Sequence, residues 1–197
     1  MLVVNYRESG SIQHALMGVD TIISTVTNDP QLQLISAAAQ ARVRRFAPAE
    51  FEGLPALRPQ DDPLDPRRYK ATALAWLQHY GIECTEFVCG ILYERFAPGG
   101  LNRHRLGLNS GVDGEGDYIV NVRTMAAQAP AHDASGQPTV TICMTAAQDV
   151  ARFVVRAIDL PEWPPVLTMY GERVTVSGLI NLVQEIRGNG CLMLHLV

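Results

Sequence analysis

Apolar positions along the first ninety residues alternate between two patterns, continuous runs and a repeat of three to four residues. Short continuous runs rich in β-branched residues are typical of strands buried on both faces. Between these runs, apolar side chains recur every three to four residues, which is typical of amphipathic helices. The predicted strands are residues 2–4, 20–26, 44–48 and 83–89. Such strands, alternating with helices, indicate an α/β protein built on a Rossmann-type, doubly wound parallel sheet.

Helix boundaries in this half follow from capping residues. The first helix starts near Ser9 or Ser11 and stops at Gly18, and the second has Asn28 or Asp29 as its N-cap. A Pro- and Asp-rich loop over residues 52–66 precedes the third helix. In that helix Asp65 is the predicted cap, Pro66 the first residue, and the helix ends at Gly81.

The second half has a less regular pattern. Residues 97–117 are rich in Gly and Asn and predict irregular structure, whereas residues 118–122 and 140–144 predict short strands. Thr145 and Gln148 form a capping-box signature before a helix with Val150, Phe153, Val154 and Ala157 facing inward. Residues 159–165 predict a rigid connector, and residues 174–187 a last helix closed by Gly188. We therefore expect a Rossmann remnant over residues 1–96 and a small, partly interleaved α+β substrate-side region over residues 97–197.

Composition excludes several classes of protein. The chain has 197 residues, 47% of them hydrophobic and 18% charged, with a net charge of −4, which describes a soluble globular protein. The densest basic patch, residues 42–45, is interpreted as a solvated helix end, so nucleic acid is not expected as a partner.

Cysteine spacing and hydropathy indicate whether the chain holds a metal site or a membrane-spanning segment. The four cysteines show no CxxC or Cys/His ligand spacing, so no metal site is expected. Neither a signal peptide nor a membrane-spanning stretch is found, and the interpretation is a cytoplasmic protein with reduced thiols.

A nucleotide site would normally begin with a Gly-rich turn between the first strand and first helix, and that turn is absent from the chain. The Gly-rich segment 111–117 comes too late and is interpreted as a loop. Ligands of open α/β sheets bind at the carboxyl ends of the strands, which makes residues 24–28 and 48–53 candidates. Ordinary strand-to-helix turns explain the same residues equally well.

Lys70 is the most suggestive single residue. Leu74 and Leu77 follow it at i+4 and i+7, so Lys70 lies on the apolar stripe of its helix rather than on the solvent face. One reading is a lysine that snorkels from a buried seam. The alternative is a cation that binds cofactor ribose hydroxyls or supplies a proton during hydride transfer.

Several segments, in order, resemble one known family. They are GVDTIISTV at 18–26, QLQLISAAAQARVRRFAPAEFEG at 31–53, GIECTEFVCGILYERF at 81–96, TICMTAAQDVARFVVRAIDLPEW at 141–163 and YGERVTVSGL at 170–179. Together with the Lys70 helix they resemble the NmrA-like and isoflavone-reductase-like proteins, atypical short-chain dehydrogenases/reductases, and are most similar to fungal members. The resemblance covers about residues 2–188.

The resemblance implies an NADP-dependent oxidoreductase that acts on a small organic molecule such as a secondary metabolite. It implies that Lys70 is the lysine near the nicotinamide and the catalytic residue. The cofactor-binding residues that it implies are Thr25, Val26, Pro48, Glu50, Phe51, Lys70, Gly90 and Ile91.

Two departures from the family pattern leave an alternative open. Ala49 stands where the family has serine, and the family's first strand, Gly-rich turn, first helix and second strand would precede Met1. The chain is therefore interpreted as a shortened, incomplete or inactive copy. The alternative is a non-catalytic NmrA-like regulator that senses nucleotide and binds a protein partner. Lys70 favours the reductase, whereas Ala49 and the absent turn favour the regulator or a fragment.

Overall fold

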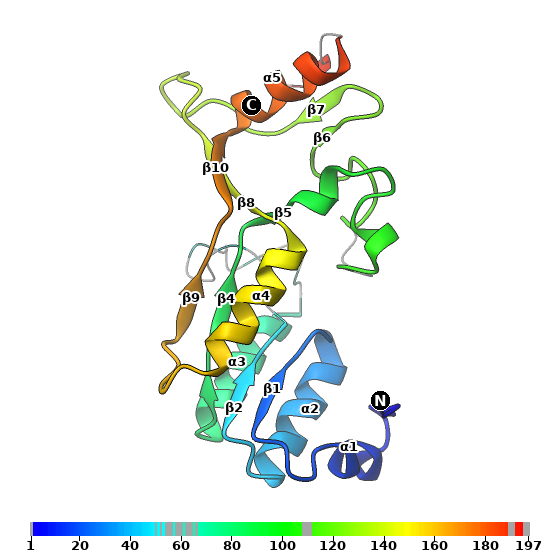
Figure 1. The fold of residues 1–197 in the computed structure, drawn as a ribbon, viewed down its shortest axis with the longest axis vertical. Coiled ribbons are helices and arrows are strands. Elements are labelled where there is room, and N and C mark those ends of the chain that lie inside the picture. The colour runs from blue at the N-terminus through cyan, green and yellow to red at the C-terminus, as the bar shows by residue number, and fades with distance from the viewer. Residues whose placement is uncertain are drawn as a thin grey trace. The chain divides into compact units, whose positions relative to one another are not determined.

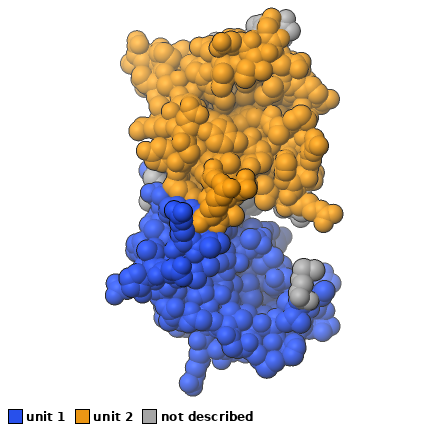
Figure 2. Space-filling view, viewed as in Figure 1, with its two compact units in different colours: residues 1–88, 153–168 blue, residues 89–152, 169–197 orange. Residues whose placement is uncertain are grey.

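The chain folds into two compact units. The computed structural model describes residues 2–49, 51, 53, 57, 61, 65, 67–107, 112–188 and 192–194. Unit 1 consists of Met1–Val88 and Phe153–Thr168, and unit 2 of Cys89–Arg152 and Met169–Val197 (Figures 1 and 2). The chain thus leaves unit 1 after Val88 and returns to it within one helix.

Unit 1 is built on parallel strands. β1 (Thr21–Ile23), β2 (Arg45–Ala47) and β3 (Glu83–Cys84) form a parallel sheet in the order β1-β2-β3. β4 (Glu86–Val88) pairs in parallel with β9 (Val166–Thr168). All three residues of the central strand β2 are buried, as the continuous apolar pattern predicts for a parallel sheet.

Helices cover these strands on both sides. α2 (Asn28–Gln40) packs against α1 (Ser9–Ala15) and α3 (Tyr69–His79), and their apolar faces share one core with β1 and β2. In Figure 1, α2 and α3 lie behind the strands and α4 (Ala147–Ile158) in front. Phe153, in the half of α4 that belongs to unit 1, meets Phe87 of β4 edge-on at a centroid distance of 6.4 Å. The doubly wound α/β prediction is confirmed.

Two predicted strands require correction. Residues 2–4 form no strand, and Leu2 and Val3 are 63% and 93% exposed. β-branched composition favours a strand only where a neighbouring strand completes the hydrogen-bond ladder. The predicted strand 83–89 is two strands, because the chain changes pairing from β2 to β9 at Thr85.

The caps also differ in detail from the prediction. α2 begins after Thr27 instead of after Asn28 or Asp29. Pro66 lies outside the described residues, and the described helix α3 begins only at Tyr69. Asp65 nevertheless caps it, because its carboxylate accepts hydrogen bonds from the backbone N–H groups of Tyr69 (2.8 Å) and Lys70 (3.0 Å).

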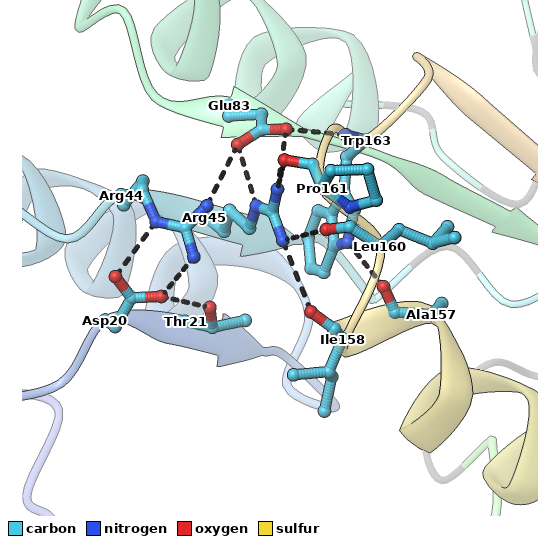
Figure 3. Close-up of polar contacts among 10 residues, drawn as sticks. All are labelled: Asp20, Thr21, Arg44, Arg45, Glu83, Ala157, Ile158, Leu160, Pro161 and Trp163. Carbon is cyan, nitrogen blue, oxygen red and sulfur yellow. Dashed lines mark hydrogen bonds and ion pairs between the residues drawn. The ribbon is translucent and has the colours of Figure 1, made fainter.

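A buried arginine corrects the interpretation of residues 42–45 as a solvated helix end. Arg45, on the central strand, is 2% exposed and forms a two-pronged ion pair with Glu83, with its Nε 2.7 Å and its Nη2 3.2 Å from the carboxylate oxygens (Figure 3). Its remaining donors reach the backbone carbonyls of Ile158 (3.3 Å), Leu160 (2.8 Å) and Pro161 (2.6 Å). The guanidinium therefore ties β2 and β3 to the connector that follows α4.

Trp163 completes this arrangement. Its backbone N–H donates to the Glu83 carboxylate at 2.5 Å, and its indole N–H donates to the carbonyl of Ala157 at 2.8 Å. The Arg45 guanidinium carbon lies 5.2 Å from the centroid of the Trp163 ring, within cation–π range. Residues 159–165, predicted as a rigid connector, are thus anchored by both their backbone and their side chains.

Unit 2 contains two small sheets. β10 (Glu172–Thr175), β8 (Thr141–Thr145) and β5 (Ile91–Leu92) form one, in the order β10-β8-β5. β11 (Leu192–Leu194), β7 (Ala126–Gln128) and β6 (Ile119–Asn121) form the other, in the order β11-β7-β6. α5 (Val176–Arg187) shares their core. The 3-10 turn η2 (Tyr93–Phe96) precedes the segment 97–117 that was predicted to be irregular, and the 3-10 turn η3 (Leu101–His104) lies within it.

Gly188 ends the last helix as predicted, whereas that helix begins at Val176, after strand β10, and not at the predicted residue 174. In α5 the Thr175 hydroxyl accepts from the N–H of Gly178, and Gly188 ends the helix with φ 70°. α4 begins beside the predicted Thr145, whose hydroxyl donates to the carbonyl of Cys89. The first-turn N–H of Ala147 donates to the carboxylate of Glu94 at 3.0 Å.

The buried ion pair generates a stability prediction. We expect Arg45→Met to lower the free energy of unfolding by about 3 kcal/mol, because Glu83 and three carbonyls lose their shared donor. Arg44→Met is the matched control, because the neighbouring Arg44 pairs with Asp20 at the surface, where the loss is much smaller. Urea unfolding of the three proteins measures the difference. Equal losses in the two variants would contradict a central role for Arg45.

The same cluster predicts acid sensitivity. The hydrogen bond from Arg45 lowers the pKa of Glu83 below its usual 4.5, and the bond from Arg44 lowers the pKa of Asp20 to about 2. A lowered folded-state pKa adds stability above the unfolded-state pKa, and this stability is lost as pH falls through the folded value. We expect the unfolding free energy to decline below about pH 4.5, less steeply in Glu83→Gln. Glu162→Gln changes an exposed carboxylate of the same connector and should retain the wild-type dependence of the unfolding free energy on pH. If the unfolding free energy of Glu83→Gln fell with pH in parallel with that of the wild type, Glu83 would not be a source of the acid sensitivity.

Candidate functional site

The turn after β1 is one of the two strand ends predicted to meet a ligand. Buried Ser24 donates its N–H to the carbonyl of Ala47 at 2.8 Å, which extends the pairing of β1 with β2. Its hydroxyl donates to the carbonyl of Val26 at 3.0 Å and accepts from the Val26 N–H at 3.4 Å. This closed turn leaves Thr25 exposed at its tip and Val26 half-buried. Thr25 is therefore exposed on a turn that Ser24 closes through hydrogen bonds to Val26.

The turn after β2 is fixed from a neighbouring helix. Pro48 is buried, and the N–H of Ala49 donates to the side-chain oxygen of Gln31 at 2.7 Å. Gln31 itself is buried in α2. Half-buried Phe51 stacks on Phe87, with ring centroids 5.8 Å apart and planes 2° from parallel. Glu50, also predicted to bind cofactor, lies outside the described residues.

Parallel pairing brings these two turns to one edge of the sheet. Ile23 and Ala47 are paired in register at the last residues of β1 and β2, so residues 24–26 and 48–49 emerge side by side. Gln31 was not predicted as part of this site, whereas Ser24 is the first residue of the candidate segment 24–28, and both residues hold the site in shape. Ser24 carried a weak signal, as a small polar residue at the end of a buried strand, whereas nothing in the spacing of Gln31 links it to Ala49.

Lys70 lies in the first turn of α3, half-buried, with its backbone N–H held by Asp65. It shares a helix face with Ala73 and Leu77, which are both fully buried. The prediction that Lys70 lies on the inward stripe of its helix is confirmed. Since α3 follows β2 and leads to the parallel strand β3, its N-terminal turn lies at the carboxyl edge of the sheet.

Gly90 and Ile91, the last two predicted site residues, belong to unit 2. Gly90 has φ +68°, and a Cβ there would lie only 2.3 Å from the carbonyl oxygen of Cys143. Half-buried Ile91 begins β5 and pairs with Met144. The structure therefore gives Gly90 a packing requirement inside unit 2, because only glycine allows β5 to approach β8 this closely.

Unit 2 also holds a cavity of about 590 Å³ that the sequence did not indicate. It lies among η2, β8, β10 and α5, and most of its lining is apolar. Lining residues include Phe96, Val122, Met144, Leu179, Val183 and Ile186. The apolar spacing of α5 was visible in the sequence, but only packing on β8 and β10 turns that face into a cavity.

A hydrogen-bonded pair forms the polar part of this cavity. The Tyr93 hydroxyl donates to the Glu172 carboxylate at 3.2 Å. Burial, together with the bond to Glu172, raises the pKa of Tyr93 above its usual value of 10.0. The tyrosine is therefore protonated at neutral pH and remains a hydrogen-bond donor.

The described residues contain neither a cluster of metal ligands nor a membrane-spanning helix. No group of three His, Cys, Asp or Glu side chains in that part of the chain is arranged to hold a metal ion. No helix among the same residues is both long and apolar enough to span a membrane.

Comparisons with known proteins support the resemblance predicted from the sequence. No family model matches the chain. The chain is similar to Oxidoreductase BOA1 of Botryotinia fuckeliana (strain B05.10), with 28% identity over 181 residues. The match covers 89% of this chain and 54% of that protein, so the chain spans about half the length of this curated relative.

Solved structures show the same fold. Isoflavone reductase superposes with a TM-score of 0.68 at 17% identity, covering 98% of this chain and 59% of that one. The leucoanthocyanidin reductase–NADPH complex of Vitis vinifera gives a TM-score of 0.69 at 15% identity, covering 97% and 59%. The Rossmann-like fold is thus confirmed, together with the likeness to isoflavone reductase in structure and to a fungal oxidoreductase in sequence.

The close approach at Gly90 generates a prediction that separates packing from a role in ligand binding. We expect Gly90→Ala to lower the unfolding free energy by at least about 2 kcal/mol, because the new Cβ collides with the Cys143 carbonyl. Gly136→Ala is the matched control: it has a similar φ of +78° but open space around it, and should cost only about 1 kcal/mol. Thermal unfolding measures both, and similar values would mean that backbone strain alone explains Gly90.

Proposed function

We propose that this protein is an NADP(H)-dependent reductase that transfers hydride to a small organic molecule. The observation that carries the proposal is a half-buried lysine in the first turn of α3, at the carboxyl edge of a Rossmann-like parallel sheet. Ligands of open α/β sheets bind at that edge. In this proposal residues 1–96 serve the nucleotide and residues 97–197 the substrate.

That the basic residue at this position is a lysine, Lys70, supports the proposal further. The chain has 16 lysine and arginine residues, and Lys70 is the only lysine among them. An arginine cannot give up its proton near neutral pH, whereas a lysine in a partly buried site can. The other 15 residues of this count are arginines, so the one side-chain ammonium group of the chain lies at the candidate site.

The residues around the sheet edge suit a nicotinamide dinucleotide. The rigid turn at Thr25 and Val26 offers an exposed hydroxyl, while Pro48 and Phe51 offer an apolar wall. We propose that these residues, with Glu50, Lys70, Gly90 and Ile91, contact the cofactor. The name of the Vitis vinifera structure, a leucoanthocyanidin reductase solved with NADPH, supports NADP(H) as the cofactor.

The chemistry assigned to the chain is binding and proton supply. When bound, NADPH would supply the hydride. The Lys70 ammonium group would donate a hydrogen bond to the ribose hydroxyls and release a proton toward the substrate oxygen that gains charge. Asp65, by holding the backbone at Lys70, would fix where the lysine side chain begins.

Turnover tests the role of Lys70. We expect Lys70→Ala to lower kcat by about 100-fold with little change in thermal stability, and Lys70→Arg to restore little activity. Gln78→Ala, on the exposed side of the same helix, should match wild type. NADPH consumption with a panel of carbonyl and enone substrates measures kcat. Unchanged turnover in Lys70→Ala would show that Lys70 has no catalytic role.

Chemical labelling provides a readout that does not require the correct substrate. Because Lys70 is the only lysine, reductive methylation of the intact protein modifies one side chain, with the α-amino group as internal reference. Bound NADPH should slow methylation of Lys70 several-fold and leave the α-amino group unaffected. Protection without turnover on any substrate would favour a non-catalytic nucleotide-binding protein. If NADPH neither protected Lys70 from methylation nor supported turnover of any substrate, the proposal would be overturned.

A further inference from the structure

The cavity of unit 2 has the dimensions and lining of a small-molecule site. Its volume of about 590 Å³ lies in the range of roughly 300–1,000 Å³ that is typical of ligand pockets. Met144, Leu179 and Val183, which line it, are almost fully buried, whereas Leu182 and Ile186 are 50% and 71% exposed. The cavity therefore has a closed apolar floor and an apolar rim open to solvent.

The polar groups of the lining are few and defined. Thr175 already accepts a hydrogen bond from the N–H of Gly178, so its oxygen serves the helix cap. The remaining polar side chains are Tyr93 and Glu172, which are bonded to each other at 3.2 Å. The carboxylate offers lone pairs beyond the one used by Tyr93, and can therefore accept a donor from a ligand.

Charge limits what this cavity can bind. Among the described residues that line the cavity, Glu172 is the only acidic one, and none is a lysine, arginine or histidine. A bound anion would meet the carboxylate without a compensating cation, and its desolvation on the apolar floor would add to the cost. A neutral molecule avoids both penalties.

We propose that unit 2 binds an uncharged, largely apolar small molecule that carries a hydroxyl group, with the hydroxyl donating to Glu172 beside Tyr93. The apolar body of the ligand covers the floor at Met144, Leu179 and Val183, and its outer side is covered by Leu182 and Ile186. This assignment concerns unit 2 alone and does not rest on the proposed reduction, because the binding is measured without cofactor.

Three matched probes test the recognition: naphthalene, 1-naphthol and 1-naphthoate, whose binding to the protein is followed by naphthyl fluorescence. We expect 1-naphthol to bind about fivefold more tightly than naphthalene, through a hydrogen bond to a charged acceptor. 1-Naphthoate should bind several-fold more weakly than naphthalene. Glu172→Gln should reduce the preference for the hydroxyl and improve binding of 1-naphthoate, while Glu185→Gln, an exposed carboxylate of α5 outside the lining, should change neither.

A second pair of variants locates the site. Leu182→Glu places a charge on the rim and should weaken 1-naphthol binding at least about tenfold, whereas Asn181→Glu adds the same charge to an exposed position outside the lining. Both positions are on the surface of α5, so both variants are expected to fold, as thermal melts will show. Equal binding of the three probes would overturn the recognition by Glu172. Equal effects of the two α5 variants would overturn the location.

Discussion

A single buried cation holds unit 1 together. Arg45 lies on the central strand β2, and it bonds Glu83 of β3 and three carbonyls of the connector that returns from α4 to β9. The connector is more than 110 residues from β2 in sequence, since Arg45 and Ile158 are separated by 113 positions. A buried guanidinium is tolerated only when its donors are satisfied, so the connector must adopt this path for the strand to remain buried. The unit is therefore closed by a buried polar constraint beside its apolar core.

That closure determines how the sheet edge is formed. Glu83 and Trp163 fix the connector, and β9 then pairs with β4 at the point where the strand begun by β3 changes neighbour. On the other side of β2, pairing with β1 sets the turns at Ser24 and Ala49 next to each other. The polar contacts of Ser24 and Gln31 satisfy the backbone of these turns, which leaves Thr25 and the half-buried Phe51 available to a ligand.

Unit 2 is characterised by an uncovered apolar surface and not by a buried ion pair. Its cavity exists because α5 carries apolar side chains on more of its surface than β8 and β10 cover, so Leu182 and Ile186 remain at the rim. The backbone nearby has little freedom, because Gly90 allows β5 to approach Cys143 and Thr175 and Gly188 fix the two ends of α5. A rigid frame around an uncovered apolar surface is favourable for binding a small apolar molecule, since little ordering is required on association.

The sequence by itself determined the elements whose signals are local. The period of apolar positions located α1, α2, α4, α5 and the strands β1 and β2, and it placed Lys70 on the inward face of α3. Asp65 and Gly188 were recognised as caps because a cap acts on backbone groups only a few residues away. Continuous apolar runs also indicated parallel pairing, and the order of the motifs indicated the reductase-like fold.

Tertiary structure alone decided what depends on distant neighbours. Residues 2–4 have the composition of a strand but no neighbouring strand, and residues 83–89 are divided because two different strands pair with them. Arg45 belongs to a basic cluster that predicts solvent exposure, yet acceptors from residues 158–161 keep it buried. The cavity beside Tyr93 and Glu172 is assembled from four segments. Local periodicity reports which face of an element is apolar, whereas pairing, burial of charge and cavities are set by which surface that face meets.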